Sequence, residues 1–255
     1  MSYLSLSFTL VFILIALFLS AWQKLRLEKE LLVATVRAAL QLLAVGFILK
    51  VVFKAHNLLF ILAMIAVMLL VAAQNATRRG QGIPHLFWRI LLTLTLIEII
   101  SQALLLGLGI IQPQPRYVIP ISGMIIGNGM IIVGLFLNRF LADTRAHLPE
   151  IWVYLALGAS ARQAILPTLK QSIRASMIPT IDSAKTIGLV QLPGMMTGMI
   201  IGGASPIEAV RYQVLIIFTL IATAAMTSIG MAFLTYPSLF TSHVQIVLPR
   251  EKGTS

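Results

Sequence analysis

The sequence predicts an all-α polytopic membrane protein with about seven transmembrane helices. Of its 255 residues, 58% are hydrophobic and only 11% are charged, whereas soluble proteins carry about 25% charged residues. The apolar residues gather in stretches of about 20, the length of helix that crosses ~30 Å of hydrocarbon. No stretch alternates with a period of two residues, and this favours helices over a membrane β-barrel.

The apolar stretches form a single membrane domain over residues 1–255. The predicted spans are 4–22, 31–53, 57–75, 87–110, 117–138, 178–202 and 207–235. The first span has no basic segment before it and no clear cleavage site after it, and its basic cluster follows the apolar run. We therefore expect a retained anchor rather than a cleaved signal peptide.

The basic residues predict the orientation. When the linkers are assigned alternately to the two sides, most of the 19 Arg and Lys residues fall on one side. The side rich in Arg and Lys is the cytoplasmic one, so we expect the N-terminus outside and the C-terminus in the cytoplasm. The same rule accounts for the net charge of +11 without a nucleic-acid partner.

The linker of about residues 139–176 is the longest, and we expect it to hold short cytoplasmic helices. Pro149 suits the first turn of one helix, and Gly158 suits its end. Ser160 precedes Gln163 by three residues, the spacing of a capping box that begins the next helix. This region is the candidate coupling region.

Polar side chains lie within several predicted spans. Arg37 and Gln41 share a helix face, as do Glu98 and Gln102, because residues four apart lie on the same side of a helix. Asn128 lies among small residues. An unpaired carboxylate deep in a membrane costs several kcal/mol, so Glu98 must face a partner, a cavity or a proton. These five residues are candidates for a translocation path, and structural hydrogen bonding across the bundle is the alternative.

Three methionines cluster in the sixth span, at Met195, Met196 and Met199. Their thioethers could guide a soft cation, although adaptable apolar packing explains them equally. The chain has no cysteine, and its four histidines fall in linkers or the tail. Thiolate metal sites are therefore excluded, and no set of metal ligands can be assigned.

Two sets of glycines recur at every fourth residue. Gly123 and Gly127 form one ridge, and Gly194, Gly198 and Gly202 form the other. Such ridges let a second helix approach closely. They predict helix packing within the chain, a seam that slides during transport, or a dimer seam.

The sixth span carries a charged pair and a helix breaker. Asp182 lies ~12 Å along a helix from Arg174, which places it near the inner hydrocarbon edge. Lys185 lies one turn further on the same face and can pair with it. We expect either a hinge between the cytoplasmic helices and the span or a plain structural ion pair. Pro193, followed by Gly194, predicts a kink or break near mid-membrane.

Several segments resemble one known family. The stretch SIRASMIPTIDSAKTIGLVQLPGMMTG (172–198) resembles the signature of the FetB-type permeases, a family of ABC-transporter subunits assigned to iron export. PISGMIIGN (120–128), RAALQL (37–42) and LGAS (157–160) are also similar to it, and the resemblance covers nearly the whole chain. Plant proteins linked to aluminium tolerance are similar too.

This resemblance implies a multi-pass permease of the bacterial inner (plasma) membrane that exports iron and contributes to metal homeostasis and oxidative-stress resistance. It implies a separate ATPase subunit, which would hold ATP and Mg, because this chain has no G-x-x-x-x-G-K-[ST] loop. The chain itself would bind no cofactor and would not be an enzyme. Helices around 157–172 would couple to the ATPase, and we expect a homodimer in membrane lipid. An ion-coupled secondary transporter, with Glu98 as the proton-linked carboxylate, is the alternative.

Overall fold

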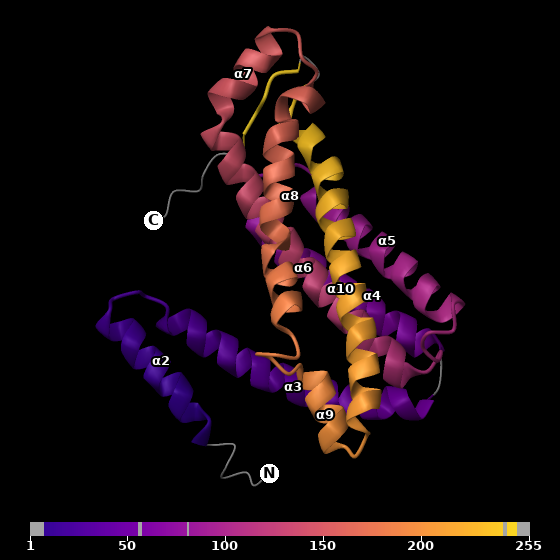
Figure 1. The fold of residues 1–255 in the computed structure, drawn as a ribbon. Helices are drawn as coiled ribbons and strands as arrows, with labels where there is room; N and C mark the ends of the chain where they lie inside the picture. The colour runs from indigo at the N-terminus through magenta and orange to yellow at the C-terminus, as the bar shows by residue number, and fades with distance from the viewer. Residues whose placement is uncertain (1–7, 56–57, 81, 242–243, 249–255) are drawn as a thin grey trace. The chain divides into compact units, whose positions relative to one another are not determined.

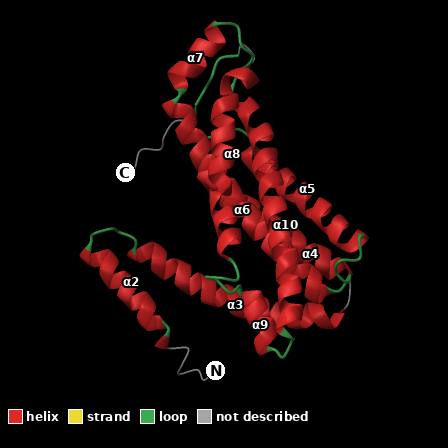
Figure 2. Ribbon diagram, viewed as in Figure 1, coloured by secondary structure: helices red, strands yellow, loops and turns green. Residues whose placement is uncertain are grey.

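The computed structural model describes residues 8–55, 58–80, 82–241 and 244–248, and these residues are helical with no β-strand (Figures 1 and 2). The all-α prediction is confirmed. Five helices are long and apolar enough to cross a membrane. They are α3 (Glu28–Ala55), α4 (Leu58–Thr77), α5 (Leu86–Gly107), α6 (Pro115–Ala146) and α10 (Pro206–Thr235). Each corresponds to one predicted span.

The chain divides into two compact units, residues 1–57 and 58–255. The first contains α3 and the shorter apolar helix α2 (Leu10–Trp22), which holds the described part of the first predicted span. The connection between them is fixed by Ser20. Its hydroxyl donates to Glu28 Oε1 at 2.8 Å and accepts from the Leu27 N–H at 3.2 Å. A buried serine therefore secures the turn between two otherwise exposed helices.

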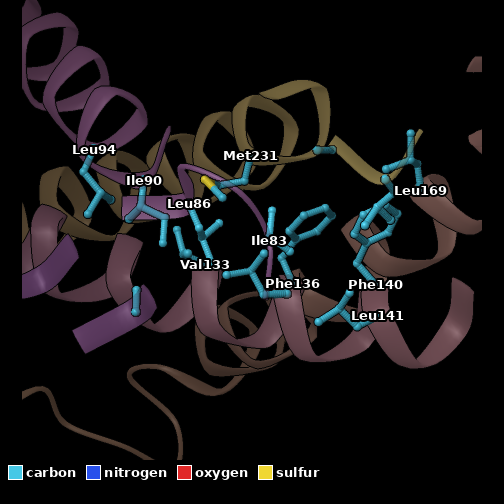
Figure 3. Packing of buried hydrophobic residues seen from close by; sticks show 14 of the residues in the cluster. Ile83, Leu86, Ile90, Leu94, Val133, Phe136, Phe140, Leu141, Leu169 and Met231 are labelled. Atoms are coloured by element: carbon cyan, nitrogen blue, oxygen red, sulfur yellow. The ribbon is translucent and has the colours of Figure 1, made fainter. Parts of the chain in front are cut away.

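The second unit is organised around α6, which packs against α4, α5, α8 and α10. Figure 3 shows the apolar core that these helices share. Phe136 and Phe140 are completely buried and stack with their ring centroids 5.3 Å apart, because residues four apart share a helix face. Ile90 of α5 and Met231 of α10 close the core from either side.

The sixth predicted span is two helices rather than one. Helix α8 (Ala161–Thr186) begins in the long linker and continues through Pro167 and Pro179, and α9 (Gly194–Ile201) follows a non-helical segment at 187–193. The predicted break at Pro193 is confirmed. Gly188 has a positive φ of 85°, which ends the first helix, and Pro193 caps the second. The span 178–202 is therefore discontinuous.

The remaining elements match the expectations for the long linker. Helix α6 extends past residue 138 to Ala146, and α7 (Leu148–Ala156) has proline in its first turn. Gly158 turns the chain with a φ of 89°. Ser160 then forms the predicted capping box, in which Ser160 N–H donates to Gln163 Oε1 at 2.9 Å and Gln163 N–H donates to Ser160 Oγ at 3.4 Å. Two 3₁₀ turns, η1 (Arg78–Gly80) and η2 (Tyr236–Leu239), follow α4 and α10.

Candidate functional site

A buried polar cluster lies between α5 and α6 and consists of Glu98, Gln102 and Ser122. Glu98 is only 3% exposed, and Ser122 is completely buried. Gln102 joins them, because its Nε2 donates to Glu98 Oε1 at 2.9 Å and to Ser122 Oγ at 2.8 Å. Gln102 lies beside Glu98 because residues four apart share a helix face. Ser122 lies beside both because α5 packs on α6. The shared helix face of Glu98 and Gln102 predicted from their spacing is confirmed, and the partner that Glu98 faces is Gln102.

Two oxygens of this cluster lack a partner among the described residues, Glu98 Oε2 and Gln102 Oε1. A buried acceptor without a donor costs about 1–3 kcal/mol. A proton or a cation at this point would satisfy both oxygens. The described residues contain no group of three or more His, Cys, Asp or Glu side chains that could hold a metal ion. Any cation at this cluster would therefore have Glu98 as its one carboxylate ligand within the cluster.

The other path candidates lie apart from this cluster. Asn128 donates from Nδ2 to the Leu220 carbonyl of α10 at 3.3 Å, a bond that ties two helices together. Met195 and its neighbours Met196 and Met199 are half-buried on α9, so both interpretations of the methionines remain open. Arg37 and Gln41 belong to the N-terminal unit.

In that unit, Arg37 and Gln41 lie on one face of α3, as predicted, and both are exposed. They line a shallow groove of about 440 Å³ with the apolar residues Leu32, Val33, Val36 and Leu40. The groove places the Arg37 guanidinium beside the Gln41 amide in an otherwise apolar lining.

The glycines that pack helices together within the chain are not the predicted ones. A Cβ atom built at Gly127, Gly194 or Gly198 would meet no atom within 4 Å, and one at Gly123 would meet only Met68 Cε, at 3.9 Å. At Gly202 the nearest atoms are carbonyls of its own helix. The prediction of close packing within the chain is therefore wrong for these glycines. Their use in a seam between copies remains a prediction.

Close approaches occur instead at Gly80 of η1, where a Cβ would lie 2.7 Å from Leu86 Cδ2, and within the long helices at Gly129 and Gly230. A Cβ at Gly129 would lie 2.8 Å from Leu94 Cδ2, and one at Gly230 would lie 3.2 Å from Thr93 Cγ2. Helices α6 and α10 thus each approach α5 through a glycine. Periodicity did not single out either position, because each is a lone glycine rather than part of a ridge.

The sequence analysis also missed a polar connection between α6 and α8. Asp143 is 5% exposed and accepts from Arg139 Nε at 3.1 Å and from Ser172 Oγ at 3.2 Å. One turn further along α8, the hydroxyls of Ser176 and Ser228 lie 2.8 Å apart and join α8 to α10. The spacing of Arg139 and Asp143 by four residues is the one local signal for this site. These bonds hold the first part of α8 against the bundle.

The Asp182–Lys185 pair forms as the spacing predicted. Lys185 Nζ lies 3.2 Å from Asp182 Oδ1, and the two side chains are 69% and 60% exposed. Such an exposed pair contributes about 0–1 kcal/mol to stability. It lies on the last turns of α8, immediately before the break.

Comparison with known proteins identifies relatives along nearly the whole chain. Residues 3–240 match the family described as uncharacterised protein family UPF0014. The membrane protein YjkA of Bacillus subtilis is 51% identical over 246 residues, which cover 96% of this chain and 98% of that protein. The probable iron export permease protein FetB of Escherichia coli is 39% identical, with 97% and 96% covered.

A plant protein is also similar. ALUMINUM SENSITIVE 3 of Arabidopsis thaliana is 38% identical over 237 residues, which cover 93% of this chain and 87% of that protein. No solved structure matches the chain. On the family match and these full-length similarities, this polytopic all-α membrane protein belongs to the UPF0014 family.

Proposed function

We propose that this chain is the permease of an ABC transporter that exports a metal cation, with iron as the first candidate, across the bacterial plasma membrane. The observation that carries the proposal is the buried Glu98 carboxylate, whose Oε2 lacks a partner among the described residues. A relative of this chain in Escherichia coli is named a probable iron export permease. Metal homeostasis and resistance to oxidative stress would follow from such export.

The Glu98 cluster has the chemistry of a transient cation site. Glu98 supplies the charge, while Gln102 Oε1 and Ser122 Oγ offer neutral oxygens. Oxygen ligands suit hard cations, and thioether ligands such as Met195 suit soft ones. A single carboxylate binds weakly enough to release its ion, as conduction requires. The same unpaired oxygen supports the second candidate, a secondary transporter in which Glu98 carries a proton.

The ATPase subunit would contact the turn between α7 and α8. The exposed side chains Trp152, Tyr154 and Leu157 form an apolar surface there. A groove of about 790 Å³ lies beside it, lined by Trp152, Leu155, Gly158, Ala159, Ser160, Val244, Gln245 and Ile246. Because α8 is one continuous helix from Ser160 to Thr186, movement at this turn would reach the break and the Asp182–Lys185 pair. Such a path supports Gly158 and Ser160 as coupling residues.

Co-expression with the cognate ATPase tests the proposal. We expect a stable complex, ATP hydrolysis by the partner subunit, and ATP-dependent movement of iron in sealed vesicles, with copper and manganese as comparison ions. Transport by this chain alone, driven by a proton gradient, would instead establish the secondary transporter. An ATPase that neither co-purifies nor responds to the permease would contradict the ABC assignment.

The second permease copy would cover the break and α9. Leu189 and Val190 of the break are 90% and 84% exposed, and α9 has no buried residue. Non-helical backbone does not face lipid within a membrane, so protein or a water-filled cavity must cover this segment. The open ridge at Gly194 and Gly198 supports a symmetric contact, because a glycine ridge is self-complementary across a two-fold axis.

Cysteine cross-linking tests this seam, since the natural chain has no cysteine. We expect Gly198→Cys to give a disulfide-linked dimer in membranes, because a Cβ atom fits freely at this position. Leu92→Cys, on an exposed face of α5, serves as the matched control and should give no disulfide-linked dimer. Cross-linking of Leu92→Cys without Gly198→Cys would place the seam on another face.

A further inference from the structure

We propose that a cavity between α4 and α6 binds the phosphate headgroup of an anionic phospholipid from the cytoplasmic leaflet. The cavity has a volume of about 230 Å³, enough for several water molecules of ~30 Å³ each. Its lining residues are Asn75, Ala76, Arg79, Met130, Ile131, Gly134, Leu135 and Asn138. They comprise one cation, two amides and a row of apolar side chains.

The two helices run side by side in register along this cavity. Asn75 Nδ2 lies 3.5 Å from Met130 Sδ, and one turn further along both helices Arg79 passes over Gly134. The Cβ position of Gly134 lies 3.5 Å from Arg79 Cγ, so the missing side chain leaves room beside the arginine stem. The absence of a side chain on Gly134 thus opens the cavity at the level of the guanidinium.

Arg79 is available to an anionic ligand. Neither the Arg139–Asp143 nor the Lys185–Asp182 ion pair involves Arg79, and the Arg79 side chain is exposed. A guanidinium binds a phosphate group through two parallel hydrogen bonds. The amides of Asn75 and Asn138 can add donors to the same group.

The distribution of polarity along the cavity fits a phospholipid. Arg79 and Asn138 lie toward the ends of α4 and α6 that the Arg and Lys distribution places in the cytoplasm. Ile131 lies ~10 Å of helix deeper than Asn138 and is 56% exposed, and Leu135 lies between them. A headgroup in the cavity would therefore have its acyl chains along Ile131 and Leu135. Basic pockets between transmembrane helices on the cytoplasmic side bind anionic lipids in this manner.

The test uses the full chain in lipid nanodiscs of phosphatidylcholine, with or without a minor fraction of phosphatidylglycerol. We expect native mass spectrometry to detect retained phosphatidylglycerol and its presence to raise the melting temperature. Arg79→Gln should weaken retention at least about tenfold, the change expected for one charge-assisted hydrogen bond. Arg78→Gln is the matched control, because it removes the same charge from the same turn at a residue outside the cavity.

Two further measurements complete the test. Gly134→Leu keeps the arginine but fills the cavity, and we expect it to lose retention while its melting temperature in phosphatidylcholine alone stays that of the unmodified chain. Inorganic phosphate added to neutral nanodiscs should leave the melting temperature unchanged. Equal losses of phosphatidylglycerol retention in Arg78→Gln and Arg79→Gln would overturn the site, because they would show that the lipid responds to general surface charge. Protection by inorganic phosphate alone would overturn the lipid as its ligand.

Discussion

Replacing Glu98 with glutamine is expected to lower metal export in vesicles at least about tenfold, equivalent to ~1.4 kcal/mol of lost stabilisation of the ion, while the protein remains folded. Glutamine has nearly the same size, and its Oε1 can still accept from Gln102 Nε2, which now bonds Glu98 Oε1 at 2.9 Å. The substitution removes the charge that would hold a cation. It also replaces a buried charged oxygen that lacks a partner with part of a neutral amide, which costs less to bury, so the melting temperature should stay unchanged or rise.

Ser122→Ala provides the control for this experiment. It removes one acceptor of Gln102 but preserves the Glu98 carboxylate, so export should fall much less than in Glu98→Gln. Export and thermal unfolding would be measured for both variants in the same vesicles and with the same ATPase subunit. Unchanged export in Glu98→Gln would remove this residue from the path. Loss of the folded protein would instead assign the cluster to stability.

Replacing Gly129 with leucine is expected to destabilise the second unit by about 1–3 kcal/mol or more, the usual cost of overpacking a core. Its first added carbon would lie 2.8 Å from Leu94 Cδ2 and 3.6 Å from Thr227 Oγ1. Leu94 and Thr227 are themselves buried, so neither can move aside freely. The melting temperature in detergent should fall, and α5 and α10 should separate from α6.

Gly127→Leu is the matched control, two residues earlier on the same helix. A Cβ atom at Gly127 meets nothing within 4 Å, so the melting temperature of the detergent-solubilised monomer should change little. Because leucine has a higher helix propensity than glycine, a stability loss in Gly127→Leu equal to that in Gly129→Leu would show that packing of residue 129 against α5 and α10 is not the source of the cost.

The features that the sequence predicted well depend on local chemistry. Apolar length located the five long helices, and capping chemistry located the start of α8 at Ser160. The break before Gly194 was also predictable, because Pro193 cannot donate a backbone hydrogen bond. Each of these features depends on residues that are close together in the sequence.

The features that the sequence did not predict depend on which helix faces meet. Spacing identified Gly127 as readily as any packing glycine, yet it is Gly129 that contacts α5 and α10. In the sequence Asp143 is one more charge in the long linker, and the structure shows that it accepts a hydrogen bond from Ser172 of α8. The continuity of α8 through Pro167 likewise follows from its packing on α6 and α10, which offsets the missing backbone bond.

The uneven burial of α8 makes it a lever with a fixed fulcrum. Its last buried residue is Ser176, joined to Ser228 at 2.8 Å, and no residue from 177 to Thr186 is buried. The unsupported arm is ~15 Å long, so a tilt of about 10° at the fulcrum would move Thr186 by roughly 3 Å. A displacement too small to break the core can therefore shift the break and α9 by about the diameter of a water molecule.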